Sequence, residues 1–197
     1  MGWRTLVNRT LGRRYHSPWW GRWLDATTAA RAMFSRHWPQ RRFVIFSIGR
    51  SGSTVLSDLL NAHPEIQCDF EILQAPLKNP WRMVRNRAAL SHADTYGFKL
   101  LHYHLQRAGQ PDAGEFLVRL HDEGWQIISL RRTNLLRQAL SGIVMKKTRR
   151  AHRYANVDGE AESDRINVDV DVLIKRMAEL ARNWTAHAAA LGQLPRI

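Results

Sequence analysis

The stretch Phe43-Val-Ile-Phe-Ser-Ile-Gly-Arg-Ser-Gly-Ser-Thr54 decides the fold of this chain. An apolar run ends in a turn of small residues, Gly49–Thr54, and apolar residues at helical spacing follow at once. We therefore predict a strand over 43–48, a glycine-rich turn, and a helix over 53–62. Such a turn points backbone N–H groups at an anion, and the helix N-terminus adds partial positive charge. With the permanent charge of Arg50, this segment predicts a site for phosphate-like oxygens.

The turn lacks two signatures of a nucleotide-triphosphate loop, G-x-x-x-x-G-K-[ST]. With Gly52 on the second glycine, serines occupy the places of the first glycine and the lysine, and Thr54 alone keeps its place. The strand expected over 125–130 ends in Arg131 and Arg132, not in a carboxylate suited to Mg²⁺. A metal-dependent kinase needs such a carboxylate. We therefore expect an anion that is bound without a metal ion.

Three segments resemble the sulfotransferase family that uses 3′-phosphoadenosine 5′-phosphosulfate (PAPS). They are the turn with Asn61-Ala-His-Pro-Glu65, the acidic segment Asp69-Phe-Glu-Ile-Leu73, and the segment Leu130-Arg-Arg-Thr-Asn-Leu-Leu-Arg-Gln-Ala-Leu-Ser141. The pattern is most similar to bacterial carbohydrate sulfotransferases of the trehalose and nodulation-factor type, and it covers about residues 42–148.

The resemblance implies two phosphate-binding sets. The residues for the 5′-phosphosulfate are those of the turn: Gly49, Arg50, Ser51, Gly52, Ser53 and Thr54. An Arg at a strand end and a Ser on the next helix would hold the 3′-phosphate. The family's usual spacing for this pair is eight residues, whereas Ser141 lies nine residues after Arg132 and ten after Arg131. This leaves open which arginine binds, and we favour Arg132. For Ser53 and Thr54, helix capping is the competing role.

Catalysis requires stabilisation of the leaving bisphosphate and deprotonation of the attacking hydroxyl. The resemblance implies that Arg50 acts on the leaving group and that a glutamate in the acidic segment is the general base. Glu71 lies between apolar neighbours, where partial burial suits a base, with Asp69 and Glu65 as competitors. Lys99, within an apolar strand, is expected to polarise the sulfate or to pair with Glu71.

Two histidines are weaker candidates for the site. His102 and His104 are expected to share one face of a strand over 96–105. A pair of this kind without a third ligand is a weak metal site. One of them could act as a base, but we expect polar lining or core histidines.

Composition sets further bounds. The chain has 197 residues, 44% hydrophobic residues and a net charge of +13, which is basic enough to attract anionic surfaces. The single cysteine excludes an internal disulfide framework, and no apolar run is long enough to span a membrane. These observations favour a bacterial cytoplasmic enzyme.

The first 42 residues differ in composition from the rest. They hold nine arginines, one acidic residue and five tryptophans. Arginine with tryptophan suits a membrane surface or an anionic polymer, so this segment could give the protein a peripheral membrane contact. The alternative is a poorly ordered tail with a short helix over 25–36. We divide the chain into this extension, 1–42, and a sulfotransferase-like domain, 43–197.

Strands and helices alternate along the second part, which predicts an α/β, P-loop-like three-layer fold with a central parallel sheet flanked by helices. The further elements expected are a short strand over 66–70, loop and irregular helix over 75–92, the strand over 96–105, a helix over 113–123, a buried strand over 125–130, helices over 134–150 and 170–191, and a polar, mobile segment over 151–167. The last four residues read like the start of a strand, so we expect that part of the C-terminal region is missing.

The predicted function is transfer of a sulfuryl group from PAPS to a hydroxyl of a carbohydrate or glycolipid, without a metal. Specific binding to nucleic acid is not expected. Two alternatives stay open: a nucleotide kinase or hydrolase with a degenerate loop, and a non-catalytic basic module that coats nucleic acid or membrane.

Overall fold

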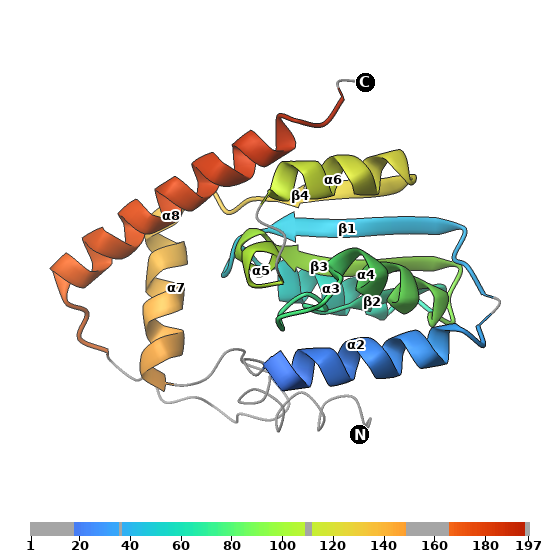
Figure 1. Ribbon diagram of the computed structural model, residues 1–197. Coiled ribbons are helices and arrows are strands. Elements are labelled where there is room, and N and C mark those ends of the chain that lie inside the picture. The colour runs from blue at the N-terminus through green and yellow to red at the C-terminus, as the bar shows by residue number, and fades with distance from the viewer. Residues whose placement is uncertain (1–17, 36, 109–111, 149–165, 196–197) are drawn as a thin grey trace.

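The computed structural model describes residues 18–35, 37–108, 112–148 and 166–195. Four strands form a parallel sheet in the order β2-β3-β1-β4 (Figure 1). Their bounds are β1 Arg41–Ser47, β2 Ile66–Asp69, β3 Thr95–Leu101 and β4 Trp125–Leu130. Strand β1 is interior and pairs with both β3 and β4, so its carboxyl end lies in the middle of the sheet.

Helices cover both faces of the sheet, because residues of β1 alternate between two apolar clusters. Phe43 and Ile45 pack with Leu56 and Leu60 of α3 (Ser53–Asn61). Val44 and Phe46 belong to the larger core, which includes Trp81 and Phe116. These two side chains come from α4 (Pro80–Ala89) and α6 (Ala113–Asp122), respectively. The predicted α/β three-layer fold is therefore confirmed.

Three further helices lie where the strands end, and one lies outside α4. The short α5 (His102–Arg107) follows β3 directly, and α7 (Leu135–Thr148) follows β4. Helix α8 (Val170–Leu191) packs against α7 and α6, and Figure 1 places α7 and α8 beyond the arrowhead of β1. Ile48, Ala139, Leu180 and Trp184 form a third apolar cluster there. Helix α2 (Pro18–Ala32) packs against α4.

The strand expected over 96–105 is too long and ends at Leu101. Leu101, Leu105 and Ala108 are all buried, and their spacing of four and three residues is that of a helix. After Leu101, this helical spacing of buried residues determines the structure, and the alternation of side chains that predicted a longer strand does not continue. His102 and His104 consequently lie on α5 and do not share a strand face.

Other bounds also differ from expectation. Residues 80–89 form a regular helix, because Pro80 occupies its first turn and Asn79 caps it by accepting a hydrogen bond from the N–H of Arg82 at 2.9 Å. Strand β4 is an edge strand, so Gln126 and Ser129 are exposed and the expected full burial is wrong. The helix near residues 25–36 begins earlier, at Pro18.

Some expectations fall outside the described residues. The segment expected to be mobile, 151–167, is described only at 166 and 167, and the last two residues are not described. Among the described residues, no helix is long and apolar enough to cross a membrane.

A polar network joins β2, β3 and α4 next to the sheet. Oδ2 of Asp69 accepts hydrogen bonds from Nε and an NH2 nitrogen of Arg87 at 2.9 and 2.6 Å, and from the Tyr96 hydroxyl at 2.9 Å. Tyr96 is fully buried, and burial followed by the nearby Asp69 carboxylate raises the pKa of Tyr96 well above its ordinary value. The phenol therefore keeps the proton that it donates.

We predict that Asp69→Asn lowers the free energy of unfolding by about 2–3 kcal/mol, because the Arg87 charge loses its counter-ion, and that Tyr96→Phe lowers it by about 1 kcal/mol. Urea denaturation measures both. Asp58→Asn, at an exposed position on α3, is the matched control and should stay within about 0.5 kcal/mol of the unchanged protein. Equal stability of all three variants would contradict a structural role for Asp69.

Candidate functional site

The turn between β1 and α3 has the backbone of an anion-binding loop. Arg50 and Gly52 both have left-handed conformations, with φ of 66° and 99°. No side chain caps the N-terminus of α3, so its first N–H groups point out of the helix without a capping hydrogen bond. The buried hydroxyl oxygens of Ser47 and Ser51 have no hydrogen-bond partner among the described residues. These donors suit a ligand rich in oxygens.

Arg50 is the residue that connects this loop to the second predicted motif. Its Nε donates to Ser141 Oγ on α7 at 3.0 Å, and its carbonyl oxygen accepts from Arg132 NH1 at 3.3 Å. Burial first, and the charge of Arg132 second, lower the pKa of Arg50. Two cationic side chains are thus held close together, an arrangement that favours an anion between or beside them.

The structure separates the two arginines that follow β4. The guanidinium of Arg132 reaches the loop, whereas that of Arg131 lies over the ring of Trp184 on α8, 5.7 Å from its centroid. Of the two, Arg132 therefore has the position expected of a phosphate ligand.

A buried amide holds the loop from the side of α7. Gln138 is 1% exposed; its Nε2 donates to the carbonyl oxygen of Gly49 at 2.8 Å, and its Oε1 accepts from Trp184 Nε1 at 3.1 Å. This contact fixes the peptide group that precedes Arg50. Gln138 and Trp184 were not predicted as site residues, because both lie far from the turn in the sequence and no local pattern links them to it.

The predicted catalytic residues Lys99 and Glu71 meet beside the same loop. Lys99 lies in the interior strand β3 and is 5% exposed. Its Nζ is 2.8 Å from Glu71 Oε1 and 3.1 Å from Thr54 Oγ1, and the Phe70 ring lies 5.5 Å away. Because Thr54 belongs to the first turn of α3, this lysine joins the carboxylate to the turn between β1 and α3.

The second oxygen of Glu71 is held as well. Its Oε2 accepts a hydrogen bond from Gln74 Nε2 at 2.8 Å and lies 3.7 Å from His104 Nε2. Glu71 is 22% exposed, so solvent or a substrate can still reach it. The carboxylate is therefore oriented by neighbours on three sides, as a positioned proton acceptor must be.

The competing carboxylates have other surroundings. Asp69 is engaged by Arg87 and Tyr96, and Glu65 is exposed in the turn before β2. Among the described residues, neither makes a hydrogen bond or an ion pair with Lys99 or with the turn from Gly49 to Thr54. Within the described part of the chain, Glu71 is therefore the only one of these three carboxylates that contacts Lys99.

Two histidines lie near each other behind the loop. Burial, and then the charge of His187, lower the pKa of His102. His187 stacks on Phe46 at 4.3 Å, and a ring nitrogen lies 3.2 Å from the Phe46 carbonyl oxygen. Burial lowers its pKa too. Both imidazoles are therefore favoured in the neutral form, and His187 on α8 was not found from the sequence.

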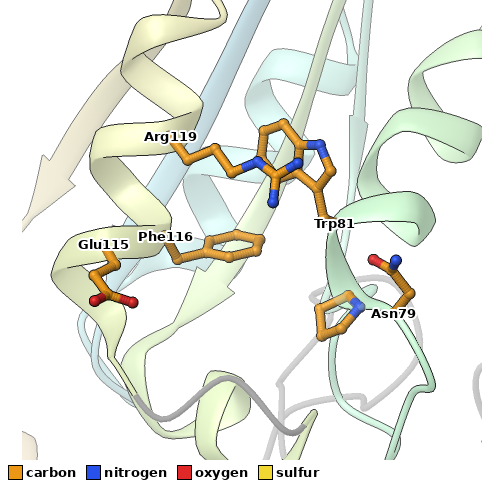
Figure 2. A pocket seen from close by; sticks show the side chains of 6 residues that line it. Asn79, Trp81, Glu115, Phe116 and Arg119 are labelled. Carbon is orange, nitrogen blue, oxygen red and sulfur yellow. The ribbon is translucent and has the colours of Figure 1, made fainter.

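A separate cavity of about 310 Å³ lies between α4 and α6. Figure 2 shows its lining, which shares no residue with the loop site: Asn79, Pro80, Trp81, Glu115, Phe116 and Arg119. Asn79 caps α4 and the Arg119 guanidinium lies 4.2 Å from the Trp81 ring centroid, whereas the buried Nε1 of Trp81 has no hydrogen-bond partner among the described residues. It lies apart from the chemistry argued for the loop.

Comparisons with known proteins add no assignment. No protein-family model matches the chain, and a search of curated proteins found no match. Within the described ranges, no group of three or more His, Cys, Asp or Glu side chains is placed to hold a metal ion. That the ligand is bound without a metal remains a prediction.

The left-handed backbone at Arg50 gives a test of the loop. A side chain with Cβ costs about 1–2 kcal/mol in this conformation, whereas glycine adopts it freely. Arg50→Gly and Arg50→Ala both remove the guanidinium, and they differ only in the Cβ atom. Because only alanine has the cost of the left-handed conformation, we expect the glycine variant to be about 1 kcal/mol more stable than the alanine variant. Thermal unfolding measures the difference. An alanine variant as stable as the glycine variant would show that the loop does not hold this conformation.

Proposed function

We propose that this chain is a PAPS-dependent sulfotransferase that transfers a sulfuryl group to a hydroxyl of a carbohydrate or glycolipid acceptor. One observation carries the proposal: the Arg50–Ser141 hydrogen bond brings the two expected phosphate-binding motifs together, next to the Lys99–Glu71 pair. A single nucleotide with phosphates at both its 5′ and 3′ positions needs this proximity. A simple anion site would not need the oriented carboxylate.

The donor would be held at two points. The N–H groups of the turn from Gly49 to Thr54, with the Ser51 hydroxyl, bind the 5′-phosphosulfate. Arg132 and Ser141 bind the 3′-phosphate. The Ser141 hydroxyl already accepts a hydrogen bond from Arg50, which leaves its own hydrogen to donate to a phosphate oxygen.

The reacting residues follow from their contacts. Glu71 takes the proton of the acceptor hydroxyl. The hydroxyl oxygen then bonds to sulfur while the bond from sulfur to the 5′-phosphate oxygen breaks. Lys99 orients Glu71 and Thr54 and adds positive charge near the transferring group. Arg50 stabilises the negative charge that develops on the leaving bisphosphate.

Donor binding can be measured with the product nucleotide, 3′-phosphoadenosine 5′-phosphate, by titration calorimetry without Mg²⁺. Arg132→Ala and Ser141→Ala each remove a charged or charge-assisted hydrogen bond, so affinity should fall about 10- to 100-fold. Arg131→Ala is the matched control, because this side chain lies over Trp184, and it should change affinity less than threefold. Binding of ATP that requires Mg²⁺, with no binding of the bisphosphate, would instead support a kinase or hydrolase.

The base is tested by transfer of radiolabelled sulfate from PAPS to a panel of neutral sugars that includes trehalose. Glu71→Gln should lower the rate about 10²- to 10⁴-fold, because the amide accepts no proton. Glu65→Gln, at an exposed carboxylate outside the cluster, should leave it unchanged. Affinity for the bisphosphate shows whether the variant is folded. A Glu71→Gln enzyme with full activity and normal binding would remove Glu71 from the mechanism.

A further inference from the structure

Helix α2 presents an apolar surface to solvent. Met33 and Phe34, in the turn that continues α2, are 82% and 90% exposed, and Trp23 is 48% exposed. Ala26 and Ala30 are also exposed and lie between them at spacings of three and four residues. These five residues form one stripe along the helix, which we call the α2 stripe. Figure 1 shows α2 along one side of the molecule, outside the sheet.

The opposite side of α2 packs on the protein: Leu24 lies against the main apolar core, and the other contacts come from polar or small residues. Asp25 is 2% exposed and pairs with Arg82 of α4 at 2.7 Å. Gly21 lies so close to the backbone of Pro76 that a Cβ would meet its carbonyl oxygen at 1.8 Å. Ser35 donates from its hydroxyl to the carbonyl oxygen of Ala89. These contacts fix the rotation of α2 and keep the α2 stripe outward.

Positive charge surrounds the α2 stripe. Arg22 and Arg31 are exposed at its two margins. Of the five arginines on the packed helices α2 and α4, Arg82 pairs with Asp25 and Arg87 pairs with Asp69. Arg22, Arg31 and Arg85 make no ion pair among the described residues. Nearby, Trp38 is 42% exposed and lies under the guanidinium groups of Arg42 and Arg85, at 5.1 and 5.8 Å. An apolar stripe with an arginine margin is the pattern of a helix that lies in a membrane interface.

We propose that the α2 stripe binds the surface of a membrane that contains anionic lipids. The side chains of Trp23, Met33 and Phe34 enter the boundary between headgroups and acyl chains, and Arg22 and Arg31 contact lipid phosphates. Nucleic acid would contact the arginines, but it binds through cationic and aromatic side chains and gains little from exposed methionine and alanine. A second copy of the chain would bring two arginine margins together, and like charges oppose that contact. The proposal stands independently of the proposed sulfotransferase activity.

Sedimentation with lipid vesicles tests the proposal on the full chain. We expect binding to vesicles of phosphatidylcholine with about 30% phosphatidylserine, and weaker binding to phosphatidylcholine alone. Met33→Ser with Phe34→Ser should lower the apparent affinity at least about tenfold, because two apolar side chains no longer enter the lipid. Arg22→Gln with Arg31→Gln should lower it about tenfold and reduce its salt dependence.

The matched control is Val170→Ser with Ile174→Ser, which removes two exposed apolar side chains from α8. It should bind vesicles like the unchanged protein, and thermal unfolding should show that all three double variants are folded. Three results would overturn the proposal: vesicle binding that survives Met33→Ser with Phe34→Ser, binding of single-stranded DNA that depends on these residues, or a dimer in light scattering that these substitutions dissociate.

Discussion

The hydrogen bond from Arg50 Nε to Ser141 Oγ joins two segments that are 91 residues apart in the sequence. Arg50 follows the interior strand β1, and Ser141 lies on the helix after the edge strand β4. This contact holds the Arg50 guanidinium beside the turn. The backbone of Arg50 has a left-handed conformation, which residues other than glycine seldom adopt. Strain of this kind persists where the surroundings enforce it, and it is concentrated at functional sites.

The first strand, turn and helix could be predicted because their signals are local. An apolar run, a turn of small residues and a helical pattern lie within about twenty residues. The meeting of Arg132 with the turn was suggested by the order of the motifs. Gln138, Trp184 and His187 could not be found in this way, because their contacts arise only when α7 packs against the turn and α8 packs back against α7 and the sheet. The end of β3 was mistaken because Leu101 and Leu105 fit both a strand and a helix.

Lys99 shows how stability and chemistry share one set of contacts. A lysine that is 5% exposed within a sheet loses much of its hydration, and this cost is offset only by close oxygen partners. Glu71 and the Thr54 hydroxyl supply them. The carboxylate that suits a proton acceptor is therefore also the counter-charge of a buried cation. Its position is fixed by the fold itself, which is the preorganisation that the proposed catalysis requires.

The contact of Gln138 with Gly49 and Trp184 has a consequence for the order in which the protein is made. Gly49 leaves the ribosome early, but the side chain that holds its carbonyl oxygen comes 89 residues later, and the indole that orients that side chain comes 46 residues after it. Contacts between such distant residues form late, since the intervening chain must first be closed. The sheet can therefore assemble while the turn from Gly49 to Thr54 is still unfinished, and the emergence of α8 completes the contacts that hold this turn.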